Sequence, residues 1–234
     1  MFSKSFSAIF SAARLLFTTK RTLALIIGAY AGLLIALYVF VTTREATISQ
    51  LLLTFVSVAA APALFFILQA LSVTYACGPA SGGLIRKTAT TGLKLVVVSL
   101  PVVALTGFAV HELDKVQSHL TTATTIRYLL VAVVAPLLTI QLWIATSSDG
   151  LRNLLKSLRL VLAKSFAPHA VVVYACGFLL FAVVPYLLLR KSIVTERAWL
   201  ELSLLIVRLA ASATLMLVGW VTTVGALSLL SRSD

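Results

Sequence analysis

The chain has 234 residues, of which 60% are hydrophobic and 11% are charged. Soluble domains normally carry about 25% charged residues, so this composition excludes an ordinary soluble protein and indicates an integral membrane protein. The 19 Lys and Arg residues outnumber the 7 Asp and Glu residues, but the cations lie beside apolar segments, which favours a role in membrane topology and argues against nucleic-acid binding.

The first segment, residues 2–17, has the pattern of a basic amphipathic helix. Lys4 and Arg14 lie away from the apolar side. A helix of this kind rests in the membrane interface, so we expect Lys4 and Arg14 to contact anionic lipid headgroups or a partner protein. The apolar side is formed by Phe2, Phe6, Ile9, Phe10, Ala13 and Phe17.

Six apolar segments follow, each about long enough for a helix to cross a hydrocarbon core of about 30 Å. They have no period of two and exceed the roughly ten residues of an outer-membrane strand, which argues against a barrel. The sequence therefore predicts an all-α, polytopic membrane helix bundle that forms a single membrane domain over residues 1–234. The expected spans are approximately 23–41, 50–76, 93–110, 128–146, 169–189 and 202–230.

Small residues and prolines indicate how these helices pack. Gly28 and Gly32 belong to a strip of small residues spaced by four in the first span. Such a strip allows close approach of another helix, either from the same chain or from a second copy. Pro62 and Pro136 lie inside returning spans, where each should kink its helix and free one carbonyl for a neighbouring group.

Residues 150–164 form a second basic amphipathic segment, between the fourth and fifth spans. Arg152, Lys156 and Arg159 lie opposite a leucine side. We expect this helix to anchor the inner face of the membrane domain and, secondarily, to offer a docking surface for anionic headgroups or a partner. The leucine side consists of Leu151, Leu154, Leu155, Leu158 and Leu162.

The charges predict an orientation and a three-part organisation. With the amino terminus inside, the inner segments carry 12 cations and 2 acids, and the outer segments carry 7 cations and 5 acids. The positive-inside rule then places both termini in the cytoplasm. Three hairpin units, 2–77, 79–148 and 150–232, share one layout, which is either a true internal repeat or the common pattern of any six-span hairpin protein.

Few residues in the sequence suggest a catalytic or metal-binding site. The cluster of His111, Glu112, Asp114 and His119 lacks the second histidine of HExxH, so we expect a solvated outer loop, with a metal or proton site as the alternative. Every carboxylate lies at or beyond a span end, which argues against ion-coupled transport. We therefore expect no catalytic residue, no bound metal, no cofactor and no enzyme activity, and two free cysteines.

Three polar residues within the spans are candidates for a functional role, namely Gln69, Gln141 and Arg208. Gln69 and Gln141 are expected either to bind a neighbouring helix or to line a cavity. Apart from Lys94 at the edge of the third span, Arg208 is the one charge inside a predicted span. We expect it to snorkel to the interface or to pair with Glu201, with a lipid or subunit contact and a substrate path as alternatives.

The six spans, the basic surface helices at 2–17 and 151–164, and the proline-bearing hairpins resemble the YciC-like multipass proteins of bacterial inner membranes. They also resemble the membrane domain of some glycerophosphodiester phosphodiesterases. The resemblance implies a bacterial inner-membrane protein concerned with the envelope or with lipids. Our leading hypothesis is an accessory or scaffold subunit that binds other membrane proteins or self-associates, and the alternative is a transporter or channel for a lipid or small amphiphile.

Overall fold

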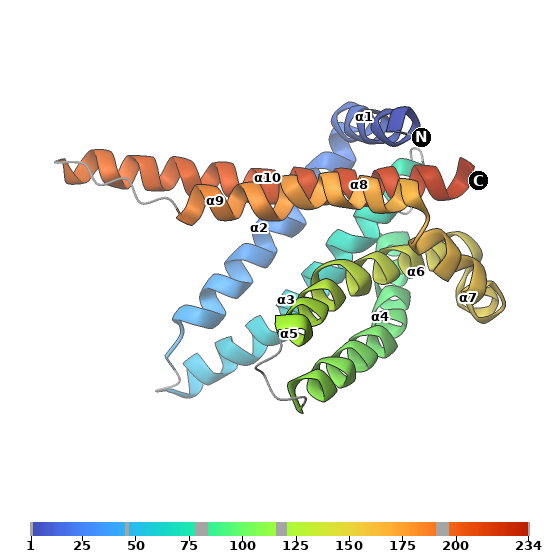
Figure 1. Cartoon of the computed structure of the whole chain (residues 1–234). Coiled ribbons are helices and arrows are strands. Elements are labelled where there is room, and N and C mark those ends of the chain that lie inside the picture. Colours follow the sequence, from blue (N-terminus) through green and yellow to red (C-terminus); the bar gives the residue numbers. More distant parts are fainter. Residues whose placement is uncertain (1, 45–46, 78–83, 116–120, 191–196, 234) are drawn as a thin grey trace.

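The structure is a computed structural model, and it describes residues 2–44, 47–77, 84–115, 121–190 and 197–233 (Figure 1). All regular elements in these ranges are helical. The α-helices are α1 (Phe2–Thr18), α2 (Lys20–Thr42), α3 (Ile48–Thr74), α4 (Leu84–Lys115), α5 (Thr121–Leu129), α6 (Ala135–Asp149), α7 (Leu151–Ser165), α8 (Pro168–Phe178), α9 (Val184–Arg190) and α10 (Ala198–Ser233). A 3₁₀ turn, η1 (Tyr75–Cys77), and two π-helical turns, η2 (Leu130–Val134) and η3 (Leu179–Val183), complete the order.

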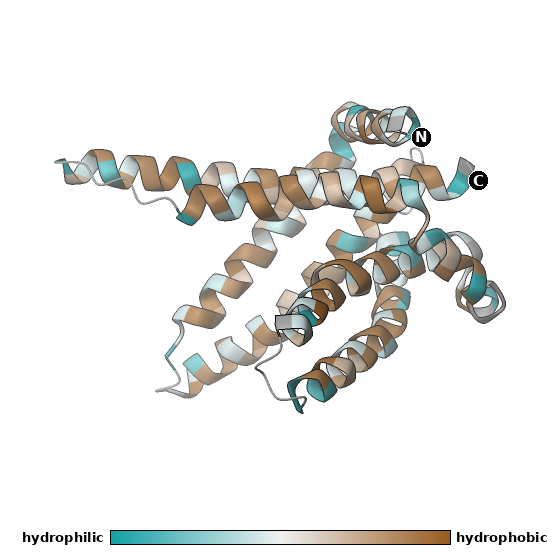
Figure 2. Cartoon of the chain, viewed as in Figure 1, coloured by the Kyte–Doolittle hydropathy of each residue, from teal (hydrophilic) through white to brown (hydrophobic). Residues whose placement is uncertain are grey.

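The predicted all-α membrane bundle is confirmed. Six helical stretches in the described residues are long and apolar enough to cross a membrane. Five of them contain the corresponding expected span, and the second ends at Thr74, two residues before the expected end at residue 76. The six stretches are Lys20–Thr42, Ile48–Thr74, Arg86–Lys115, Thr122–Ser148, Pro168–Arg190 and Ala198–Arg232. Figure 2 shows apolar residues along these helices and polar residues mainly at their ends and on α1 and α7. The chain is a multipass membrane protein.

The helices form three hairpins that share one well-packed end. Helix α2 packs along α3, α4 packs against α6, and the continuous α8–η3–α9 helix runs beside α10 (Figure 1). We call the end that carries α1, α7 and the last turns of α10 the terminal end. The opposite end, where the two helices of each hairpin are connected, is the loop end. The main apolar core lies toward the terminal end and includes Leu95, Ile140, Val173, Val224 and Leu227.

Helix α1 packs on the third hairpin, against α10 and α8. Ala8 and Ala12 are buried in the main core, while Phe10 on the other side of α1 is 73% exposed. The Tyr75 hydroxyl lies 3.2 Å from the Val221 carbonyl oxygen and 3.4 Å from that of Ala12, within hydrogen-bond distance of both. Burial raises the pKa of this hydroxyl above its ordinary value. Tyr75 therefore links α1, η1 and α10 at the terminal end.

Two of the span prolines follow directly on π-helical turns. Pro136 comes after η2 and Pro185 after η3, and a proline cannot donate the backbone hydrogen bond that an α-helix requires. Four residues before Pro136, the carbonyl oxygen of Ala132 instead accepts a 2.6 Å hydrogen bond from the Tyr174 hydroxyl. The expected compensation for a freed carbonyl is thus observed at Pro136. Pro62 lies inside α3 at an exposed position.

Glycines allow the closest helix contacts between α8 and α10, and between η1 and α10. A methyl group at Gly177 would overlap Thr223, and one at Gly225 would overlap the Tyr75 hydroxyl. On the predicted small-residue strip, a methyl group at Gly32 would lie 3.3 Å from Leu64 of α3, but one at Gly28 would meet no atom within 4 Å. The strip therefore packs within the chain at Gly32 and stays open at Gly28.

Candidate functional site

A cavity of about 710 Å³ lies at the centre of the membrane domain, among α2, α3, α4, α6 and α10. Its volume is in the range of about 300–1,000 Å³ that is typical of small-molecule sites. None of its lining residues carries a formal charge. The wall contributed by α2, α3 and η3 consists of Tyr30, Leu33, Phe65, Phe66, Leu68, Gln69 and Phe181, and that contributed by α10 consists of Met216, Leu217 and Trp220.

The cavity is closed toward the terminal end and open toward the loop end. Helix α4 contributes Ser99, which is buried, and then, further toward the loop end, Val103, which is 67% exposed. Exposure changes in the same way along the helical run from η2 to α6, where Val131 is exposed toward the loop end and Ile140 is buried toward the terminal end. A molecule in the cavity would therefore meet a closed floor and an open mouth.

Two tryptophans form the polar part of the floor. The Trp143 indole nitrogen donates to Ser99 Oγ at 2.8 Å, and Ser99 Oγ donates to the Leu95 carbonyl oxygen at 2.7 Å. The Trp220 indole nitrogen donates to Gln69 Oε1 at 2.7 Å. Both buried indole N–H groups thus have the acceptor that they need in an apolar setting.

The Gln69 carboxamide is left with unused donors. An indole N–H can only donate, so the Gln69 oxygen must face Trp220 and the amide nitrogen must face elsewhere. That nitrogen donates to none of the residues that the structure describes. Gln69 is 1% exposed and lines the cavity, so its NH₂ group is a buried donor available to a molecule bound there.

Paired aromatic rings also line the cavity. Phe65 packs edge-on against Trp143 with ring centroids 6.4 Å apart, and Phe181 packs edge-on against Trp220 at 5.2 Å. Such rings bury a large apolar area in a fixed arrangement. The cavity is therefore shaped for a hydrophobic molecule with a small polar group.

The two predicted glutamines have different positions. Gln69 both binds a neighbouring helix, through Trp220 of α10, and lines the cavity. Pro136 also lines the cavity. Gln141 is 4% exposed and lies outside the wall of this cavity, so of the two expected roles, that of lining this cavity is observed for Gln69 alone. The reason is the helix period: Gln141 follows the lining residue Ile140 by one position and therefore points about 100° away around α6.

Arg208 caps the preceding helix. Its Nε donates to the Leu188 carbonyl oxygen at 2.7 Å, and its Nη2 donates to the carbonyl oxygens of Leu188 and Leu189. These carbonyls belong to the last turn of α9 as the structure describes it, and the carboxyl end of a helix leaves its carbonyl groups without intrahelical donors. The expected pairing with Glu201 is replaced by this cap, which satisfies backbone groups inside an apolar setting.

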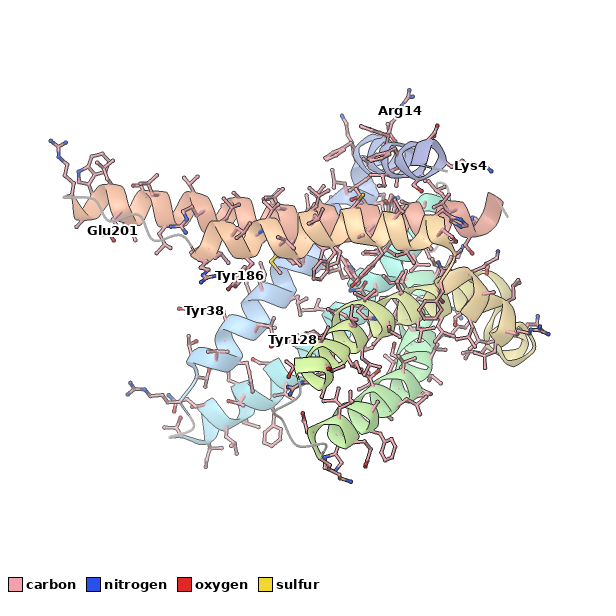
Figure 3. The ribbon with its side chains drawn as sticks, viewed as in Figure 1. Lys4, Arg14, Tyr38, Tyr128, Tyr186 and Glu201 are labelled. Carbon is pink, nitrogen blue, oxygen red and sulfur yellow. The ribbon has the colours of Figure 1, made fainter. Side chains whose placement is uncertain are left out.

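The predicted interfacial cations lie on the surface where they are described. Lys4 and Arg14 are exposed on α1 (Figure 3), and Arg159 is exposed on α7. The side chains of Arg152 and Lys156 lie outside the described part of the structure. Lys164, in the last turn of α7, donates from Nζ to the Ser231 carbonyl oxygen at 2.7 Å and so ties α7 to the end of α10.

The histidine-containing cluster forms ion pairs at the loop end. Lys115 Nζ lies 2.7 Å from Glu112 Oε1, and Arg127 Nη1 lies 3.0 Å from Asp114 Oδ1. Within the described ranges, no three His, Cys, Asp or Glu residues come close enough to hold a metal ion. His119 lies outside those ranges. Cys176 is a free thiol, and the side chain of Cys77 is not among those described.

The sequence patterns did not indicate four residues of the floor, namely Ser99, Trp143, Phe181 and Trp220. A signal was available for the tryptophans: a Trp placed well inside an apolar span needs an acceptor for its N–H group, and Gln69 and Ser99 are among the few polar side chains at comparable depth. No pattern in one sequence could assign which acceptor goes with which indole.

Comparisons with protein-family models, with curated proteins and with solved structures gave no match to this chain.

Proposed function

We propose that this protein binds a lipid or another small amphiphile in the central cavity and transports it. The observation that supports this proposal is the cavity of about 710 Å³, which lies amid six apolar spans, has an uncharged wall of aliphatic and aromatic residues, and opens toward the loop end. Ligand sites are typically concave and mostly apolar, with a few polar groups that orient the ligand. Gln69 is such a group.

The proposed setting is the bacterial inner membrane with both termini in the cytoplasm, as the distribution of cations suggests. The terminal end then faces the cytoplasm, and the mouth of the cavity faces the outer leaflet. In this arrangement α1 and α7 rest at the inner interface, where Lys4, Arg14 and Arg159 are free to meet anionic headgroups. A hydrophobic molecule would enter from the outer half of the bilayer.

Obstruction of the cavity mouth tests this function. Gly107 lines the mouth, and a side chain added there meets no atom within 4 Å. Gly107→Phe should therefore fold normally but reduce the flux of a fluorescent lipid into proteoliposomes by about tenfold or more. Leu105→Phe is the matched control, because Leu105 lies on the same helix, is exposed and is outside the cavity wall. Equal flux in both variants, or no flux in the unaltered protein, would contradict transport.

A second candidate function, that of an accessory subunit which associates with another membrane protein or with itself, is favoured by the open face of α2 at Gly28. A Gly28→Cys variant without the two natural cysteines should crosslink within membranes to a second subunit. Leu93→Cys, which is also exposed, serves as the control. Crosslinking no greater than that of the control would exclude association through this face.

A further inference from the structure

We propose that the ligand of the central cavity is an uncharged, largely hydrocarbon molecule that carries a carbonyl group, and that this carbonyl accepts a hydrogen bond from the amide nitrogen of Gln69. This inference rests on the proposed lipid-binding function and specifies the chemical class of the ligand. It depends on three properties of the cavity, which are its charge, its unused donor and its shape.

The absence of charge in the wall decides the charge of the ligand. No lining residue is Asp, Glu, Lys, Arg or His. A phosphate or ammonium group placed beside the floor would lose its hydration without an opposite charge to compensate, which is costly within a membrane. A headgroup that is ionised at neutral pH is therefore excluded from the floor, and the polar part of the ligand is neutral.

The Gln69 amide decides the sense of the hydrogen bond. Its oxygen already accepts from Trp220, and its NH₂ group has no acceptor among the described residues. The hydroxyls of Ser99 and Thr139, which also line the cavity, donate to the carbonyl oxygens of Leu95 and Ala135. These two hydroxyl protons are therefore already used, and the Gln69 NH₂ group is left as the unused donor beside them. An ester or ketone oxygen supplies the matching acceptor.

The shape of the cavity sets the position of this carbonyl. Gln69 is hydrogen-bonded to Trp220 at the closed floor, which Trp143 also lines, and the wall toward the mouth is aliphatic at Val102, Val103 and Val110. A ligand that reaches Gln69 with its carbonyl must place the hydrocarbon part along this aliphatic wall. Two tryptophans therefore lie next to the bound molecule, and they provide an optical signal for its binding.

Quenching of tryptophan fluorescence by brominated lipids tests the proposal. The chain has 3 tryptophans, and Trp199, which is 62% exposed near the start of α10, can be removed as Trp199→Phe. In micelles of an unbrominated detergent, dibrominated diacylglycerol should quench the remaining fluorescence at concentrations about tenfold lower than dibrominated phosphatidylglycerol or a dibrominated hydrocarbon of equal chain length. The same titration on the Gly107→Phe background should abolish the preference.

Variants of the floor separate the donor from general packing. Gln69→Met should weaken the binding of diacylglycerol about fivefold to tenfold, the effect expected from the loss of one buried hydrogen bond, and should leave binding of the hydrocarbon unchanged. Gln141→Met is the matched control, since Gln141 is also buried but lies outside the cavity.

The outcomes distinguish this inference from the proposed function. Equal quenching by phosphatidylglycerol would overturn the uncharged class, and equal quenching by the hydrocarbon would overturn the carbonyl contact. Either result leaves lipid binding in the cavity intact. Quenching that is the same with and without Gly107→Phe would show adventitious partitioning only, and would overturn both proposals.

Discussion

The terminal end and the loop end of this bundle are built from helices of similar composition but differ in packing. At the terminal end, α1, α3, α8 and α10 enclose a core in which Val173, Val224 and Leu227 are fully buried. At the loop end the hairpins diverge (Figure 1), and exposed aromatic residues such as Tyr38, Tyr128 and Tyr186 project from them (Figure 3). One end is a fixed base, and the other end leaves room for a ligand and contact with lipid.

This difference arises from small residues and polar contacts, since both ends are apolar. Gly177 and Gly225 allow α8 and η1 to approach α10 closely at the terminal end. Close approach strengthens van der Waals contact, which drives helix association where lipid is as apolar as the side chains. Substitutions that disturb the base should therefore destabilise the whole protein, and substitutions near the loop end should act locally.

The largest effect is expected for Gly177→Leu. The added side chain would overlap Thr223 and force α8 away from α10, which should cost about 3 kcal/mol of stability. Thermal unfolding in detergent, followed by size-exclusion chromatography, should show a lower midpoint and loss of the monodisperse peak. Gly107→Leu, toward the loop end, should behave as the unaltered protein does, and equal destabilisation by the two variants would contradict the contrast between the ends.

A smaller effect is expected for Tyr174→Phe. This change removes the hydrogen bond to the Ala132 carbonyl oxygen beside Pro136, leaving the carbonyl unpaired in an apolar setting at a cost of about 1–2 kcal/mol. Chemical denaturation monitored by circular dichroism would measure it. Tyr186→Phe alters an exposed tyrosine on α9 and should be neutral. If both variants are neutral, the hydrogen bond does not support the π-helical turn.

The smallest effect on global stability is expected for Arg208→Met. Its loss leaves the carbonyl oxygens of Leu188 and Leu189 without their donor, so the last turn of α9 should fray while the base stays folded. Hydrogen exchange should increase about threefold or more in residues 186–190 and stay constant in residues 221–230. Arg208→Lys should restore part of the protection. Faster exchange at the base would show that the two ends are coupled.

The sequence was sufficient to predict which segments form helices, but it was insufficient to predict which residues contact one another between helices. Runs of about 20 apolar residues with terminal charges predict spans because a lipid environment forces the backbone to satisfy itself locally. Gln69 and Pro136 were identified as candidates because polar groups and prolines are rare at that depth. The partners of Gln69 could not be derived, since Trp220 lies 151 residues away and the contact depends on how three hairpins pack. For the same reason, Gln141 could not be separated from Gln69 in advance.

The position of α1 has a consequence for biosynthesis. This helix is translated before α8 and α10, which form its docking face and lie more than a hundred residues later in the chain. During synthesis, α1 therefore stays undocked beside the membrane while more than a hundred further residues are inserted. Its exposed phenylalanines are suited to lie in the membrane interface during this time. Assembly of the base is therefore completed only once α10 has been inserted and meets α1.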